Sequence, residues 1–376
     1  MVEWRLTTVG TTTAVGESIM HLVELTCRGF RGLEAIRFRP GPGLNIIHGD
    51  NAQGKTSLLE AILFGATSKS HRTSLESELV RRDADAFHLA LHARRRDRDV
   101  RLEASWRSGV KRFKVNGVPQ TRISDILGKI NVVFFCPEDV SLVSGAASYR
   151  RRFLDMELSQ LLPDYLAALQ HYRQALRQRN ELLRQSACDN AQLDVWDDQL
   201  AAHGRVLVEE RGNFVAQLGR LAALAHGRIA NGEELRIVYK ANVPTDQPLL
   251  DVLARTRETD RRQGATTRGP HRDDLELSVA QAAARGFASQ GQQKTAALAV
   301  KLAETELVTS RAGECPILML DEALAELDHA RSRQLLDAID KKIQCIMTTT
   351  DPGDPCCLDG PGFSHFGIVR GCLEER

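Results

Sequence analysis

Residues 44–62 read LNIIHGDNAQGKTSLLEAI, and this stretch predicts the fold of the chain. Its first apolar residues are typical of a buried strand, and Gly49, four residues and then Gly54-Lys55-Thr56 have the spacing of a phosphate-binding P-loop. Such a loop points successive backbone N–H groups at phosphate oxygens, and glycine permits the positive φ that this requires. The helix that follows adds its N-terminal dipole. We therefore expect an α/β fold of the P-loop NTPase class.

The side chains of this loop have separate predicted roles. Lys55 would bridge the β- and γ-phosphates, and the Thr56 hydroxyl would hold one position of a Mg²⁺ ion, which prefers oxygen ligands. We expect nucleotide contacts from the whole loop: Gly49, Asp50, Asn51, Ala52, Gln53, Gly54, Lys55, Thr56 and Ser57. The alternative is a plain glycine-rich turn, and a P-loop alone indicates only that a nucleotide is bound.

Composition places few limits on function. The chain has 376 residues, enough for two or three structural units, with 42 % apolar and 26 % charged residues. The formal net charge of +1 gives no global nucleic-acid signal, so DNA binding would need local basic patches. No apolar run approaches the length of a membrane span, and residues 1–19 contain no apolar core of a signal peptide. The eight dispersed cysteines contain no C-x-x-C pair, which favours reduced thiols and a cytoplasmic location.

Patterning along the chain predicts two lobes and an N-terminal extension. Residues 1–19 have the character of a disordered extension. Period-two alternation over residues 88–118 predicts an antiparallel meander beside the P-loop sheet, and apolar spacing over residues 145–231 predicts two antiparallel helices joined near residues 186–192. We predict an ATPase lobe I from residues 20–136 and 312–376, and a largely helical lobe II from residues 137–311.

An apolar segment near the C-terminus supplies the acidic partner that a P-loop ATPase needs. Residues 316–322 read PILMLDE, a buried strand that ends in two carboxylates. At the strand end Asp321 can reach the magnesium shell while Glu322 reaches the attacking water. We therefore predict Thr56 and Asp321 as metal ligands, with Lys55 and Glu322 as the catalytic residues.

A third segment, residues 288–297, opens a helix with the sequence ASQGQQKTAA. Ser289, Gly291 and Gln292 would present a hydroxyl and free N–H groups to anionic oxygen. The alternative is an ordinary helix N-cap. Because the segment follows a P-loop and precedes an acidic strand, it resembles the signature motif of ABC-type ATPases. In that superfamily the signature of one protomer covers the γ-phosphate on the P-loop of the other, so the resemblance implies an ATP-dependent homodimer.

The order of several motifs resembles the bacterial RecF family, from about Met20 to the end of the chain. The most specific motifs are FCPED at residues 135–139, YRRRFLD at residues 149–155 and GPHRDDL at residues 269–275. They separate RecF from transporter ATPases and from SMC heads, whose insertion is a much longer coiled coil. By the same resemblance Glu138 occupies the Q-loop region, and Asp328 lies in the D-loop between protomers.

The resemblance implies an ABC/SMC-type head with mixed sheets and an inserted helical lobe. It also implies a DNA-repair ATPase that dimerises on ATP at gaps or single-strand/duplex junctions and acts with RecO and RecR. Such a protein promotes recombinase loading, replication restart and the SOS response. Thr350 stands where transporter ATPases carry histidine, and Gln290 stands where many signatures carry glycine. We therefore expect weak, DNA-stimulated ATPase activity used as a switch.

Candidate DNA contacts are basic residues with competing explanations. Arg150 and Arg151 belong to a charge cluster that would either start a helix or contact phosphate. Arg173 and Arg177 fall on one helix face, which is either a solvated surface or a DNA contact, and Arg72 could reach nucleotide or DNA. Two other functions stay open: a static ATP-binding scaffold for repair partners, and a P-loop phosphotransferase acting on a small molecule.

Overall fold

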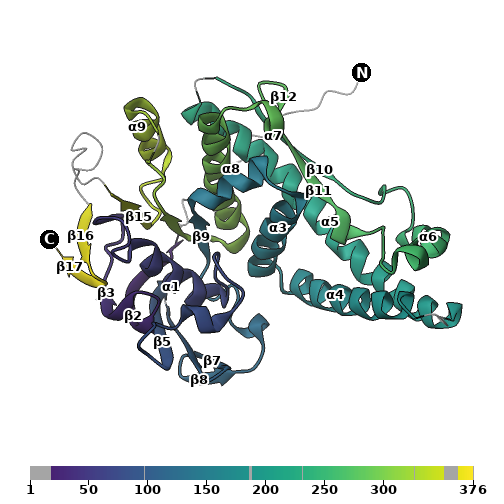
Figure 1. The fold of residues 1–376 in the computed structure, drawn as a ribbon. Coiled ribbons are helices and arrows are strands. Elements are labelled where there is room, and N and C mark those ends of the chain that lie inside the picture. Colours follow the sequence, from purple (N-terminus) through teal and green to yellow (C-terminus); the bar gives the residue numbers. More distant parts are fainter. Residues whose placement is uncertain are drawn as a thin grey trace, which may run out of the picture.

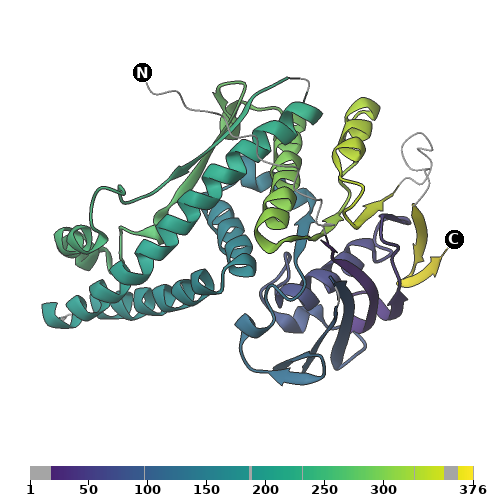
Figure 2. The same cartoon turned by 180° about the vertical axis from the view of Figure 1, so that it is seen from behind.

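The computed structural model describes residues 18–96, 98–185, 189–230, 232–325, 327–350 and 363–375. A sheet-rich lobe lies beside a lobe dominated by long helices (Figures 1 and 2). The predicted extension lies outside the described residues except for Ser18 and Ile19. These two residues form β1 (Ser18–Ile19), which pairs with β13 (Glu314–Cys315). Regular structure is therefore present before the predicted start of lobe I.

A six-stranded sheet carries the P-loop strand near its centre. In spatial order its strands are β17 (Cys372–Glu375), β16 (Ser364–Val369), β4 (Leu44–His48), β15 (Cys345–Thr349), β14 (Ile317–Leu320) and β9 (Val132–Phe135). All pairs are parallel except that of β16 with β17. Because parallel strands end at the same edge of a sheet, the segments that follow β4, β9, β14 and β15 meet there.

The central strands of this core sheet are buried on both faces, as their uninterrupted apolar sequences predict. Along β9, Val132 and Phe134 enter one hydrophobic core, while Val133 and Phe135 enter the other. The first core contains α1 (Lys55–Thr67) and the second contains the helical lobe. The core sheet is thus the layer that both lobes share.

A second, antiparallel sheet covers α1 from the other side. Its strands, in spatial order, are β3 (Leu33–Phe38), β2 (His21–Phe30), β5 (Ala86–Arg95), β6 (Arg98–Arg107), β7 (Val110–Val115) and β8 (Val118–Gln120). The antiparallel pairing of β5 to β8 confirms the predicted meander. Most residues of α1 are buried because the helix has a sheet on either side.

Lobe II contains more elements than its apolar spacing predicted. Its helices are α2 (Ser141–Ser144), α3 (Ala147–Leu161), α4 (Pro163–Leu183), α5 (Asn190–Ile229), α6 (Leu249–Gln263), α7 (Ala284–Phe287) and α8 (Gln290–Ala312). The predicted helix pair is present as α4 and α5, but α3 is separate because Pro163 begins α4 and cannot continue α3. Three short strands also form a sheet that we did not predict: β10 (Leu235–Lys240), β11 (Asp274–Val279) and β12 (Ala282–Ala283).

The last helix among the described residues, α9 (His329–Ala338), lies between β14 and β15 in the sequence. The predicted boundaries between lobes fall at the end of β9 and at the end of α8.

Within the described ranges, no helix is both long enough and apolar enough to span a bilayer.

Candidate nucleotide-binding site

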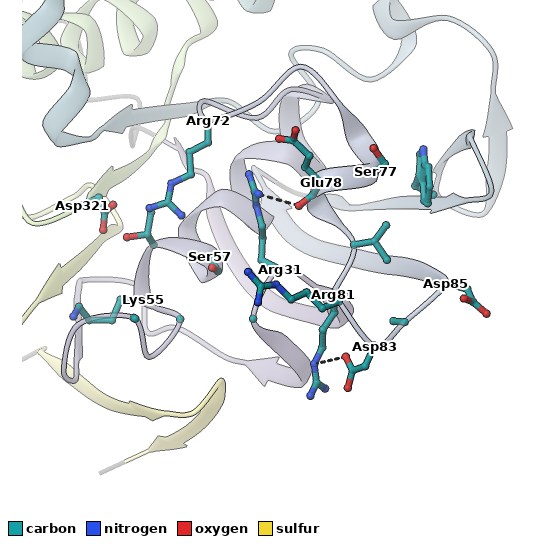
Figure 3. Close-up of a pocket in the computed structure, with 18 of the residues that line it drawn as sticks. Arg31, Lys55, Ser57, Arg72, Ser77, Glu78, Arg81, Asp83, Asp85 and Asp321 are labelled. Atoms are coloured by element: carbon teal, nitrogen blue, oxygen red, sulfur yellow. Dashed lines mark hydrogen bonds and ion pairs between the residues drawn. The ribbon is translucent and has the colours of Figure 1, made fainter.

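A cavity of about 1410 Å³ opens at the carboxyl edge of the core sheet. The residues that line it come from separate segments: Lys55 from the P-loop, Arg72 from the loop after α1, Glu138 from the segment after β9, and Asp321 and Glu322 from the end of β14. Figure 3 shows Lys55 and Asp321 at one end of the cavity, with Arg31 and Arg81 further along it. The sheet topology therefore brings the predicted phosphate and metal ligands to one place.

The P-loop has the backbone conformation that its glycines allow. Gly49 has φ 156° and Gly54 has φ 113°, and a Cβ on Gly54 would lie 2.9 Å from the Leu33 side chain. The Lys55 ammonium group donates hydrogen bonds to the carbonyl oxygens of Gly49 (2.6 Å) and Asp50 (3.0 Å). Burial lowers the pKa of Lys55, while the carboxylates of Glu322 and Asp321 oppose that shift.

The two carboxylates after β14 point to different places. Asp321 is 3 % exposed, and its Oδ1 accepts a 2.6 Å hydrogen bond from the Thr348 hydroxyl. Glu322 has φ 47°, an uncommon conformation for a residue other than glycine, and its Oε1 lies 4.0 Å from the Lys55 ammonium. The turn after β14 thus gives one buried carboxylate and one that faces the P-loop lysine.

The donor set at Asp321 fits a magnesium ion. Burial raises the pKa of Asp321, and hydrogen bonds from Thr348 and Thr56 oppose that shift. The Thr56 hydroxyl and the Asp321 carboxylate are therefore close enough to bind one hard cation through oxygen. When bound, Mg²⁺ would neutralise phosphate charge at this end of the cavity.

Thr348 is a site residue that the sequence analysis missed. Its hydroxyl donates to Asp321 and accepts a 3.0 Å hydrogen bond from the Glu322 backbone N–H. Thr350, which stands where transporter ATPases carry histidine, instead lines a separate cavity of about 480 Å³ on the Gly49–Asp50 side of the P-loop. Strand alternation does not separate the two threonines, because residues two apart in a strand point to the same face. The pairing of Leu320 with Met347 is what places Thr348 beside Asp321.

Arg31 is a second residue that the sequence analysis missed. It lines the cavity, has φ 54°, and makes a bidentate pair with the buried Glu60 carboxylate at 2.8 and 3.0 Å. In the sequence, the indication for Arg31 was its place as a charged residue in the GFRG turn between β2 and β3. Arg72 lines the same cavity, which favours a nucleotide contact over the DNA contact that we also considered.

The signature turn lies outside the nucleotide cavity of the same chain. Ser289 caps α8, with reciprocal hydrogen bonds from Gln292 N to Ser289 Oγ (3.2 Å) and from Ser289 N to Gln292 Oε1 (2.8 Å). The 23 residues of α8 span about 34 Å, and the C-terminal end of this helix leads into the core sheet (Figure 1). Ser289, Gly291 and Gln292 line none of the cavity beside Lys55.

The segments around the signature turn contact each other. Lys294 of α8 donates to the carbonyl oxygen of Ala325 and lies 3.5 Å from that of Glu322. Asp328 caps α9 by accepting a 2.8 Å hydrogen bond from Arg331 N. A Cβ on Gly291 would lie 3.2 Å from Arg331 Nη1. The signature helix is therefore connected to the turn that carries the acidic residues.

The structure corrects one predicted DNA contact and shows that two other predicted residues already have protein partners. Arg150 is 3 % exposed and pairs with Asp274 at 2.6 Å, so its guanidinium is not available to phosphate. Arg151 is partly buried and donates to the Asp273 carbonyl oxygen at 2.7 Å. Arg173 pairs with Asp155 at 2.7 Å but keeps half of its side chain exposed, and Arg177 is exposed on α4.

Two of the most specific sequence motifs meet inside lobe II. Buried Arg211 pairs with Asp155 at 2.8 Å and with Asp273 at 3.1 Å. The His271 ring shares a 2.7 Å hydrogen bond with the Tyr172 hydroxyl and a 2.9 Å contact with the Thr266 carbonyl oxygen. These motif residues therefore build a buried polar connection, which is a structural role.

Comparison with known proteins gives a consistent result over nearly the whole chain. The family model described as RecF/RecN/SMC N terminal domain matches residues 21–353. A DNA replication and repair protein RecF from Symbiobacterium thermophilum is 40 % identical over 374 residues, covering 95 % of this chain and 99 % of that protein. The corresponding protein of Lachnoclostridium phytofermentans is 42 % identical over 336 residues, covering 88 % and 93 %.

Solved structures agree with the sequence relatives. A structure of the recombination mediator protein RecF with ATP in the RecFOR pathway has TM-score 0.89 and 30 % identity, and the match covers 97 % of this chain and 100 % of that one. An SMC head domain from Pyrococcus furiosus has TM-score 0.58 and 17 % identity, with 95 % and 96 % coverage. The second likeness shows the head fold alone.

Proposed function

The chain belongs to the RecF family of DNA replication and repair proteins, and from that premise we propose that it is an ATP-dependent DNA-binding protein of recombinational repair. ATP with Mg²⁺ would occupy the cavity beside Lys55. Two copies would then close over two nucleotides and bind gapped or single-strand/duplex DNA. With RecO and RecR as partners, the protein would promote recombinase loading, replication restart and the SOS response in the cytoplasm.

One observation carries the dimer in this proposal. The predicted phosphate-binding residues Gly54, Lys55 and Thr56 line this cavity, whereas Ser289, Gly291 and Gln292 do not. A signature turn that does not line the nucleotide cavity of its own chain is consistent with one that covers the P-loop of a second copy. Relatives described with ATP in the RecFOR pathway support both the nucleotide and the partners.

The proposed chemistry is slow hydrolysis of ATP. Glu322 would orient the attacking water, Lys55 would stabilise charge on the phosphates, and Asp321 with Thr56 would hold the metal. Arg31 and Arg72 add two guanidinium groups at the same cavity. DNA would stimulate turnover, and the nucleotide state would act as a switch between monomer and dimer.

The first test measures nucleotide binding and molar mass in solution. Lys55→Met should abolish ATP binding and with it the dimer, whereas Ser289→Arg should keep ATP binding and lose only the dimer. Binding of labelled ATP and light scattering with and without ATP provide the two readouts. An ATP-dependent dimer that is unchanged in Ser289→Arg would contradict the head-to-tail arrangement.

A second test addresses DNA. Binding to gapped, single-stranded and duplex DNA should be compared over a salt series, with and without ATP, because phosphate contacts make the affinity fall with salt. Arg177→Glu should weaken binding at every salt concentration, and Arg173→Glu should do so to a smaller extent because Arg173 already pairs with Asp155. Equal binding by both variants and the wild type would remove α4 from the DNA surface.

The two alternative functions predict different results. A static scaffold would show no effect of Glu322→Gln on the lifetime of the dimer, whereas a hydrolysis-driven switch would be trapped as a dimer. A small-molecule phosphotransferase would transfer phosphate to a metabolite, and DNA would not change its turnover.

A further inference from the structure

The loop after α1 and the turn after β9 bring together three side chains of the types that bind metals in proteins. The ligand atoms of His71, Cys136 and Glu138 all lie within 4.8 Å of one another. These residues belong to two segments that are far apart in the sequence, and they lie beside the nucleotide cavity without belonging to the predicted magnesium set. The cluster thus places an imidazole, a thiol and a carboxylate around one point.

A second observation concerns the histidine of this cluster. Both ring nitrogens of His71 are shielded from solvent and have no hydrogen-bond partner. The ring packs on Phe134 with a centroid distance of 4.8 Å, which holds its plane in position. A buried polar atom without a partner is costly, so a ligand that accepts the nitrogen lone pair would remove that cost.

Space and further donors are also present. A cavity of about 80 Å³ is lined by His71, Cys136, Glu138 and Asp139, which is room for an ion and its water. The Asp139 carboxylate lies 3.6 Å from the Cys136 sulfur and supplies one more oxygen donor.

From this geometry we propose that His71, Cys136 and Glu138 form a binding site for a divalent cation of the zinc class. A nitrogen, a sulfur and an oxygen donor suit a borderline-soft ion in tetrahedral coordination, with water or Asp139 as the fourth ligand. Magnesium, which prefers oxygen donors alone, would not compete for the sulfur.

The site would connect metal binding to the nucleotide cavity. Arg72 follows His71, and both Arg72 and Glu138 line that cavity. A cation held by His71 and Glu138 would fix the distance between these two segments, and therefore the position of Arg72. This coupling rests on the proposed ATP function, whereas metal binding itself does not.

The test uses the full chain, freed of metal with a chelator and dialysed against Zn²⁺ in excess Mg²⁺. We expect one equivalent of zinc per chain. Co²⁺ in its place should give the charge-transfer band of a thiolate ligand. His71→Ala and Cys136→Ser should each lose the equivalent and the band, while Cys372→Ser, at an exposed free cysteine, should keep both. Circular dichroism establishes that each variant is folded.

Three outcomes would overturn the site. These are no zinc retained by the wild type, a cobalt spectrum without thiolate character, or equal zinc content in all variants. For the coupling, zinc should change the affinity for ATP by about fivefold or more in the wild type and not in Cys136→Ser. Unchanged ATP affinity with bound zinc would overturn the coupling alone, and a chain that binds zinc but no ATP would overturn only the proposed function.

Discussion

The Thr348 hydroxyl connects the Asp321 carboxylate to the backbone N–H of Glu322, and the first prediction concerns this residue. Thr348→Val removes the hydrogen bond to Asp321 and leaves the Glu322 N–H without its acceptor. Groups that orient metal ligands typically contribute 10- to 100-fold, so we expect Mg²⁺-dependent ATP turnover to fall by roughly that factor.

The control for this prediction is Thr350→Val, which changes a hydroxyl in the separate cavity beside Gly49. It should leave turnover within about twofold of the wild type, because Thr350 is not the threonine that contacts Asp321. Steady-state hydrolysis at saturating ATP is the measurement. Equal effects of the two substitutions would show that we chose the wrong threonine.

The second prediction concerns His271 and acid stability. Burial lowers the pKa of His271 from its usual 6.5 to about 4, so the folded protein holds the neutral ring. The stability that the neutral ring contributes is fully present above pH 6.5 and is lost as the pH falls toward about 4. Over this interval the unfolded chain, with its higher pKa, binds a proton that the folded chain does not. His271→Gln removes the titration, and its loss of stability over this interval should be smaller than that of the wild type.

Urea unfolding at a series of pH values measures this difference. Comparing the change between two pH values within each protein cancels the fixed cost of the substitution. A wild type and variant with the same pH dependence would contradict the assignment of a neutral, buried ring.

At the scale of elements, α1 packs against the antiparallel sheet with no room for a side chain at Gly65. A Cβ on Gly65 of α1 would overlap the fully buried Leu91 side chain of β5. Gly65→Ala should therefore destabilise the protein by about 1–3 kcal/mol, although alanine is the better helix former. Since α1 begins at Lys55, ATP affinity should fall as well.

Gly227 of α5 provides a matched control, because a Cβ at that helical position would meet nothing within 4 Å. Gly227→Ala should stabilise the protein by about 0.5–1 kcal/mol through helix propensity alone. Chemical denaturation of both variants gives the two values. A destabilising Gly227→Ala, or a neutral Gly65→Ala, would argue against the packing described for that helix.

At the scale of the whole molecule, the two lobes share one sheet. Alternate side chains of β9, β14 and β15 enter different cores. If the sheet separated from one core, the apolar side chains of the other core would also be exposed to water. We expect the described lobes to unfold together in a single transition, although chains of this size often divide into independent domains.

Tryptophans in the two lobes can report on this cooperativity. Trp106 lies in β6 and Trp196 lies in α5, so a variant that keeps one of these two and has Trp4 replaced as well has a single tryptophan that monitors one lobe. Their unfolding midpoints should coincide, and saturating ATP should raise both by the same amount. Separate midpoints would indicate that the sheet does not couple the lobes.

The sequence by itself determined the class of fold and predicted which residues form the candidate nucleotide site. Glycine spacing, the lysine and the threonine of the P-loop are local requirements, and an all-apolar strand that ends in two carboxylates is also a local pattern. Both can be read from neighbouring residues because backbone conformation and strand burial depend on short-range sequence. The meander was predicted for the same reason.

Only the tertiary structure decided which polar residues meet across long distances. The parallel register of β4, β15 and β14 selects Thr348 rather than Thr350, and the packing of α3 against β11 turns Arg150 into a buried ion pair. The small sheet of β10 to β12 and the cluster at His71 likewise depend on the order in which segments pack. Charged and hydroxyl side chains do not recur along the chain at a spacing that identifies their partners. Their roles therefore depend on which segments the fold brings together.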